Sequence, residues 1–291
     1  MKNFFIFTGL SFFCFFICSV FFLKSNFSSK INSDFFKNSQ NFSFSKTFTF
    51  NEKDTVVKNY EESFDLNNID KIRIDAEMGA FKIKSKEGLN DKVIFKIKTF
   101  SKKGTETFDV QGKTLNLKIK KLGKETYINK STEVVVYLPK NSKNLDLETF
   151  VSFGEVKLRD LIFNNLTVDI AAGSFKGKSL TLNEAKIEVS AGEVKLSDTF
   201  FNSIKSSVDG GSAVIKGLNP APKAIVKTSA GKIDFEVDKS VVKNFRLQAK
   251  TSFGSTKLVE GYTESTDGSY VYGDGKGEVV LKADLGEINV F

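Results

Sequence analysis

Eight glycines in this chain occur in a similar local sequence context, and several are separated by the same interval. Gly154, Gly173, Gly192 and Gly211 follow one another every 19 residues. Repetition at a fixed period of about 20 residues is typical of stacked-repeat proteins, in which one repeat cannot bury its own apolar face and needs neighbours. This repeat therefore constrains the fold more than any other feature. The full set of turn glycines is Gly79, Gly154, Gly173, Gly192, Gly211, Gly231, Gly254 and Gly286.

The residues around each glycine alternate between apolar and polar. The positions seven, five, three and one before the glycine, and two and four after it, are apolar with few exceptions. Alternation with a period of two predicts half-buried β-strands. Its phase changes at the glycine, which predicts a corner, and glycine accepts the positive φ or close backbone approach that a corner needs. Each repeat is thus expected to be two short strands bent at the glycine.

Stacking such repeats in parallel, about 4.8 Å apart, continues each apolar position through a common core. The expected fold is all-β: a parallel β-solenoid, either a β-helix or a β-roll, with rungs of about 19 residues. In the alternative, a β-sandwich, the glycines would be hairpin turns. Hairpins reverse the chain and give no reason for a constant interval. The interval lengthens after Gly231, and residues 261–277 are expected to form an excursion loop.

Residues 86–140 interrupt the repeat without losing the strand pattern. This β-rich insert follows the first rung and alternates over Val93–Lys98, Leu115–Lys120 and Val134–Leu138, with turn sequences between them. It is either an antiparallel sheet or a set of degenerate rungs. Residues 66–291 are therefore expected to form one continuous solenoid domain that includes the insert.

Residues 1–23 have the composition of an export segment. Phe4–Leu23 contains no charged residue and lies between Lys2 and Lys24. A run of this length can span a bilayer as one hydrophobic helix, and a charged start before an apolar stretch also describes a signal peptide. We expect either a signal anchor in the cytoplasmic membrane, with the domain outside, or a cleaved signal that releases the chain. Residues 24–65 lack a sustained period and are expected to be a linker or stalk.

The chain contains no histidine, and both cysteines lie in the apolar N-terminal run. Histidine general bases, Ser-His-Asp and Cys-His triads and the usual zinc sites are therefore excluded. Outward carboxylates alternate with lysine or serine, as on a solvated sheet, although a carboxylate-based glycosidase or lyase remains an alternative. We expect no enzyme activity, no catalytic residues, no cofactor and no metal site.

Basic residues recur three and five positions after the glycines. If the rungs stack, these residues form a stripe of closely spaced cations on one outward face. Lysine there either keeps a flat sheet soluble or binds an anionic polymer, such as phosphorylated polysaccharide, or lipid headgroups. The net charge of +8 fits both, and nucleic acid is not expected because no aromatic residues interleave with the stripe. The candidate polyanion-binding residues are Lys82, Lys84, Lys157, Arg159, Lys176, Lys178 and Lys195.

Several segments resemble a known family. Ile72–Gly79, a strand region ending in Val134–Pro139, and repeated units of the form Leu166–Gly173 are similar to the bacterial putative-adhesin family of unknown function, DUF4097. The resemblance covers about residues 66–291. It implies a bacterial cell-envelope protein with a β-helical or β-roll domain, and it supplies no catalytic residues. The phenylalanine-rich N-terminus and the long final excursion depart from the family pattern.

These patterns predict a non-enzymatic cell-envelope protein that presents a rigid solenoid surface for binding or adhesion. The expected partners are envelope components, either anionic polysaccharide or lipid, or a protein. The alternative is a structural or regulatory scaffold that associates with itself end to end. Ile288–Phe291 motivates that alternative, because this final segment reaches the C-terminus without a polar cap and would leave a strand edge unpaired.

Overall fold

The computed structural model divides the chain into two compact units, residues 1–49 and 50–291. The N-terminal apolar run and the linker as far as residue 57 lie outside the described residues, so the predictions for them stay predictions. Among the described residues, regular structure consists of β-strands alone, and no helix suited to crossing a membrane is found there. The described residues are 58–99, 106–120, 132–140, 142, 145–217, 223–237, 245–258, 261–264, 266, 270–272 and 276–291.

The strands of the second unit form one large sheet. Its twelve strands pair in the order β1-β3-β6-β2-β7-β8-β12-β9-β11-β10, with β5 beside both β2 and β4. The predicted all-β class is confirmed, and the sheet is solenoid-like because its repeat-bearing strands pair in parallel. The strands are β1 (Lys58–Asp65), β2 (Lys71–Lys86), β3 (Lys92–Thr99), β4 (Glu106–Gln111), β5 (Thr114–Ile119), β6 (Thr132–Pro139), β7 (Asp146–Gly217), β8 (Lys223–Val237), β9 (Phe245–Leu258), β10 (Thr263–Glu264), β11 (Tyr270–Tyr272) and β12 (Gly277–Val290).

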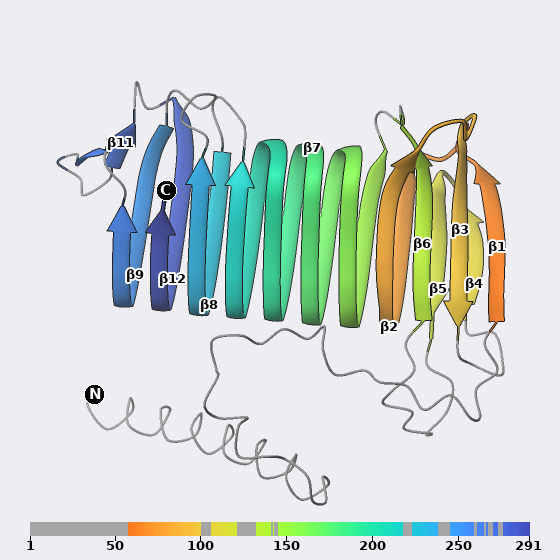
Figure 1. Ribbon diagram of the computed structural model, residues 1–291, viewed down its shortest axis with the longest axis horizontal. Helices are drawn as coiled ribbons and strands as arrows, with labels where there is room; N and C mark the ends of the chain where they lie inside the picture. Colours follow the sequence, from red (N-terminus) through yellow and green to blue (C-terminus); the bar gives the residue numbers. More distant parts are fainter. Residues whose placement is uncertain are drawn as a thin grey trace, which may run out of the picture. The chain divides into compact units, whose positions relative to one another are not determined.

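β7 continues unbroken for 72 residues, and Figure 1 shows its successive turns side by side. Side chains 19 positions apart are in contact. Asn183 Nδ2 donates a hydrogen bond to Asn164 Oδ1 at 3.3 Å, and Asn202 Nδ2 donates to Asn183 Oδ1 at 3.0 Å. Stacked asparagines of this kind form ladders in which each amide bonds to the next. The hydrophobic pattern gave no sign of this ladder, because asparagine on a polar surface is common.

The glycines of neighbouring rungs lie directly over one another. Gly79 pairs with Gly154 between β2 and β7, and the later glycines have φ angles between 138° and 157°. A Cβ built on Gly192 would lie 1.7 Å from the carbonyl oxygen of Gly173. Such a contact is impossible without moving the backbone, and the φ angle itself disfavours other residues. Glycine is therefore required at this corner for two independent steric reasons.

The hydrophobic pattern predicts that the residue just before each glycine faces the core, and this is wrong. Phe153, Leu285 and Phe253 occupy that position and are 57%, 53% and 75% exposed. Two positions earlier the side chains are buried, as at Val151. The chain begins to turn before it reaches the glycine, so the side chain immediately before the corner points away from the core.

A second corner lies six residues after the glycine. Asp160, Ser179 and Asp198 have φ angles of 56°, 53° and 51°. This left-handed conformation is uncommon outside glycine but is tolerated by short polar residues that bond to the local backbone. The sequence pattern predicts only the glycine corner, since polar residues at a turn leave no hydrophobic signature.

The final strand does not form an edge of the sheet. β12 pairs in parallel with β8 on one side and with β9 on the other, so it lies between two strands that precede it in the chain (Figure 1). The prediction that Ile288–Phe291 leaves an unpaired edge is therefore wrong. β9 is the last parallel rung, and β11, from the predicted excursion loop, pairs with its first residues, Phe245–Leu247.

The insert combines both predicted alternatives. β5 and β6 pair in parallel with the two halves of β2 and together make a broken rung. β3 pairs antiparallel with β6, and β4 with β5. β1, which precedes the insert and occupies the end of the segment predicted as linker, pairs antiparallel with β3. In the part of the chain that the structure describes, the buried apolar core extends from Ile69 to Val290. The second unit thus contains its own core, as expected of a domain that folds by itself.

Candidate functional site

The predicted basic residues gather on one outward face of the strands that follow the glycine corner. Parallel pairing of β2 with β7 places Lys82 beside Lys157 and Lys84 beside Arg159. The neighbouring side chains Val156 and Leu158 are buried, so alternation along the strand directs the basic residues outward. We call this surface the basic face, and it comprises Lys82, Lys84, Lys157, Arg159, Lys176, Lys178 and Lys195.

Glu155 joins two residues of the basic face. Its carboxylate lies 2.6 Å from Lys157 Nζ and 3.0 Å from Lys176 Nζ, which belong to positions 19 residues apart. Burial opposes ionisation of Glu155, but hydrogen bonds from the two ammonium groups outweigh it and lower the pKa of the carboxyl below its ordinary value. Glu155 is therefore a fixed countercharge that holds these two lysines in place.

The other members of the basic face are less neutralised. Arg159 Nε lies 3.2 Å from Asp160, and Lys84 Nζ lies 5.0 Å from the ring centroid of Tyr137. No ion pair joins Lys82, Lys178 or Lys195 to any residue that the structure describes. These three ammonium groups are the part of the face most available to an anion.

One edge of the basic face includes residues that sequence reasoning missed. Tyr137 in the broken rung pairs with Lys84, and its ring also lies within 5.3 Å of Lys86 Nζ and 5.9 Å of Lys96 Nζ. Cations near an aromatic face are held by the ring quadrupole. The alternation of β6 in the sequence predicts a strand that contains Tyr137. The position of that strand beside Lys84 depends on pairing between β6 and β2, which the alternation does not reveal.

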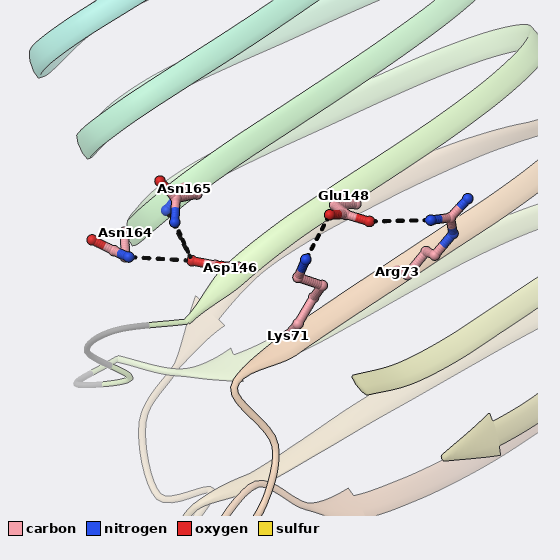
Figure 2. A network of polar contacts seen from close by, with 6 residues as sticks. All are labelled: Lys71, Arg73, Asp146, Glu148, Asn164 and Asn165. Atoms are coloured by element: carbon pink, nitrogen blue, oxygen red, sulfur yellow. Dashed lines mark hydrogen bonds and ion pairs between the residues drawn. The ribbon is translucent and has the colours of Figure 1, made fainter. Parts of the chain in front are cut away.

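Elsewhere the same sheet sets opposite charges beside each other. Figure 2 shows Glu148 of β7 between two cations of β2: Lys71 Nζ lies 2.7 Å and Arg73 Nη1 3.3 Å from its carboxylate. On the adjoining turn, Asp146 Oδ1 accepts hydrogen bonds from the backbone and side-chain nitrogens of Asn165 at 3.1 and 3.0 Å. Neighbouring rungs of this fold can therefore place opposite charges side by side. The fold does not force the basic face to place like charges side by side.

The chemistry available on the basic face is multivalent electrostatic binding. Its functional groups are ammonium and guanidinium cations, which attract anions without covalent change. Across the described portions of the chain, no group of three or more acidic, histidine or cysteine side chains is arranged to hold a metal ion.

The family model described as Toastrack DUF4097 matches residues 69–280. The chain belongs to the Toastrack DUF4097 family. The resemblance noted in the sequence is thereby confirmed. No match was found among curated proteins.

Solved structures from three bacterial species are similar to the Toastrack chain. A "putative cell adhesion protein" from Clostridium sporogenes has 19% identity and a TM-score of 0.37, with 81% of this chain and 99% of that chain covered. A "putative adhesin" from Bacteroides fragilis has 14% identity and a TM-score of 0.45, with coverage of 80% and 97%. A "putative lipid binding protein" from Parabacteroides distasonis has 13% identity and a TM-score of 0.39, with coverage of 80% and 96%.

Proposed function

We propose that this Toastrack protein is a non-enzymatic cell-envelope protein whose solenoid binds an anionic polymer along the basic face. In this proposal residues 1–23 anchor the chain in the cytoplasmic membrane or direct its secretion, and the residues that follow, up to the start of β1 at Lys58, connect them to the exported domain. The domain is a rigid stack of rungs of about 19 residues. The proposal needs neither a cofactor nor a metal.

The observation that carries the proposal is the arrangement of like charges on the basic face. Lys82 and Lys157 are directly paired neighbours, as are Lys84 and Arg159. Like charges opposite each other on a sheet destabilise it, and this protein pairs opposite charges between rungs elsewhere. A partner that supplies negative charge at regular intervals would relieve that repulsion. A polymer of phosphate or uronate groups does so, and each further contact adds to the avidity.

Polyphosphate and polygalacturonate are suitable probes, with dextran as the uncharged control. We expect the full chain in detergent micelles to bind both polyanions, with affinity that falls as salt rises. The variant K82Q/K178Q/K195Q removes the three cations without an ion pair among the described residues and keeps the Glu155 contacts. It should bind roughly tenfold more weakly or worse, because several exposed charges act together. Binding is measured by titration calorimetry.

The matched control is K92Q/K120Q/K223Q, which removes the same charge from exposed lysines that are not paired with another cation in the sheet. This variant should retain most of the affinity for both polymers. Equal losses in the two variants would mean that net charge alone attracts the polymer, and the basic face would then have no specific role.

A second candidate is a self-associating envelope scaffold. The observation that favours it is the open side of β9: Thr256 is exposed, whereas Phe81 and Val156 at the same position in β2 and β7 are fully buried. An exposed strand edge can pair with another chain. Sedimentation of the same samples distinguishes the candidates, because a monomer that does not change with concentration rules out the scaffold.

A further inference from the structure

Three lysines form a ladder at the end of the sheet opposite the insert. Lys282 of β12 is paired with Lys227 of β8 on one side and with Lys250 of β9 on the other. All three are exposed, and none makes an ion pair with a residue that the structure describes. Directly opposed like charges are destabilising on a sheet, so this lysine ladder is not a device for holding the rungs together.

Apolar side chains accompany the ladder on the same strands. Three residues after the respective lysines, Leu285 is paired with Ala230 and with Phe253. Leu285 is 53% exposed and Phe253 is 75% exposed, at the corner where side chains leave the core. Two residues before Lys227 and Lys282, Ile225 and Val280 are only half-buried.

These residues make up one amphipathic surface, which we call the corner patch. It consists of Lys227, Lys250, Lys282, Phe253, Leu285, Ile225 and Val280. Two acidic residues of β12, Glu278 and Asp284, are also on the outward side of these strands and are exposed. The basic residues Lys223 and Arg246 are paired with Glu278 in the neighbouring strands. Cations therefore outnumber anions around the apolar tips.

We propose that the corner patch docks on an anionic lipid bilayer. Phe253 and Leu285 would enter the boundary between headgroups and acyl chains, and the lysine ladder would face the phosphates. A surface that combines exposed apolar tips with nearby lysines suits this environment, because apolar burial and attraction to anionic lipid add together. An acidic groove on a protein could form ion pairs with the lysines. Such pairing would not explain why Phe253 and Leu285 project from the corner beside them.

The chain itself supplies a reason why this surface meets a membrane. If residues 1–23 stay in the bilayer as proposed, the domain that begins with β1 at Lys58 is tethered to that bilayer. Tethering raises the effective concentration of the lipid surface, so weak docking suffices. The basic face is defined by lysine and arginine alone, whereas the corner patch combines lysines with Phe253 and Leu285, which are more than half exposed. The membrane proposal does not rest on polymer binding.

The absence of tryptophan from the chain allows a direct test. F253W places a single fluorescent reporter in the corner patch, and F153W places one at the same corner position of β7, where Phe153 is 57% exposed. The full chain carrying either reporter is reconstituted in phosphatidylcholine vesicles, with or without one-third phosphatidylglycerol. Phospholipids with brominated acyl chains are included as quenchers.

We expect F253W emission to shift to shorter wavelength and to be quenched in the phosphatidylglycerol vesicles, but not in phosphatidylcholine alone. F153W should remain unquenched in both. In the F253W background, K227Q/K250Q/K282Q should reduce quenching to the level of F153W, whereas K82Q/K178Q/K195Q should leave it unchanged. The circular dichroism spectrum and melting temperature of each variant verify that it is folded.

Three outcomes would overturn the proposal. Equal quenching of both reporters means that the domain adsorbs without using the corner patch. Unquenched F253W in anionic vesicles means that the patch stays in water. A wavelength shift that grows with protein concentration and is not accompanied by bromine quenching means that a second copy of the chain covers the patch. If the unsubstituted chain binds neither polyanion while F253W is still quenched in anionic vesicles, the proposed function is rejected and this inference stands.

Discussion

The two ends of the stacked sheet are finished differently. At one end β3 and β4 pair antiparallel with the broken rung, and β1 pairs antiparallel with β3. Phe64, Phe95 and Phe108 pack there with ring centroids 5.1 to 6.0 Å apart. At the other end β11 pairs with the first residues of β9, Phe245–Leu247, and Thr256 further along β9 is exposed. Stacked-repeat proteins need modified terminal repeats, because an ordinary rung would expose its core.

The difference shows that one end is closed by apolar packing and the other by substituting polar residues into an otherwise ordinary rung. The closed end buries Phe95 and packs the partly buried Phe64 and Phe108 against it. The open end keeps the glycine corner and the parallel register of its neighbours, yet it exposes Phe253 and the lysine ladder. The open end therefore leaves part of its terminal rung exposed to solvent, whereas additional strands cover the terminal rung at the closed end.

The largest expected effect comes from breaking the glycine corner in the middle of the stack. In Gly192→Ala the new Cβ meets the Gly173 carbonyl oxygen at 1.7 Å, with rungs on both sides. In Gly254→Ala the clash with Gly286 is equally close, but the terminal rung can move outward. We expect a loss of about 4 kcal/mol or more in the free energy of unfolding for the first and about 1–2 kcal/mol for the second. Urea denaturation measures both.

Gly112→Ala is the control, since its φ is 60° and its added Cβ meets nothing within 4 Å. It reports the cost of a left-handed φ without a steric clash, about 1 kcal/mol. Equal losses for the substitutions at Gly192 and Gly254 would show that the open end is as rigid as the middle.

A smaller loss of stability is expected when one phenylalanine is removed from either end, and the loss should differ between the two ends. Phe64 packs against Phe95 and Phe108 at the closed end, so Phe64→Ala should cost about 2–3 kcal/mol through lost burial and ring contacts. Phe253→Ala removes a mostly exposed ring and should change stability by less than about 0.5 kcal/mol. Thermal denaturation followed by circular dichroism compares them. A clear loss for Phe253→Ala would indicate that the open end is packed against something in solution.

The smallest expected loss of stability comes from Glu155, whose carboxylate pairs with Lys157 and Lys176 in the basic face. The pKa of Glu155 is lowered in the folded protein because hydrogen bonds from Lys157 and Lys176 outweigh its burial. Its stabilising contribution is therefore complete above the ordinary carboxyl pKa of about 4.3, fades as pH falls below that value and is lost below the folded pKa. Glu155→Gln should cost about 0.5 kcal/mol at neutral pH, since the pairs are partly exposed.

The measurement is urea denaturation of wild type and Glu155→Gln across the acid range, with Glu264→Gln on β10 as the exposed control. The stability difference between wild type and Glu155→Gln should shrink as pH falls. A stability difference that persists in strong acid would contradict the assigned pairing, because a protonated Glu155 carboxyl cannot form ion pairs with the two lysines.

Local sequence was sufficient to predict the repeating part of the molecule. Period-two alternation is a property of a single strand, so residues such as Val156 and Leu158 could be assigned to the core without knowing their partners. The same alternation put Lys82, Lys84 and Lys157 on the outward side, and the parallel register then placed them together. The exposed position of Phe153 could not be predicted in this way, because the direction of a side chain at a corner depends on backbone angles that hydrophobicity does not encode.

The sequence by itself determined the all-β class, the glycine corners and the outward placement of the basic residues, since each follows from sterics or alternation within one repeat. Tertiary structure alone decided which rungs are neighbours. Nothing in the alternation of β12 distinguishes a strand added after β9 from one inserted between β8 and β9. That choice sets Lys282 beside both Lys227 and Lys250, and Leu285 beside Phe253. Parallel strands with the same alternation can pair in several orders, and only the free energy of the complete stack selects among them.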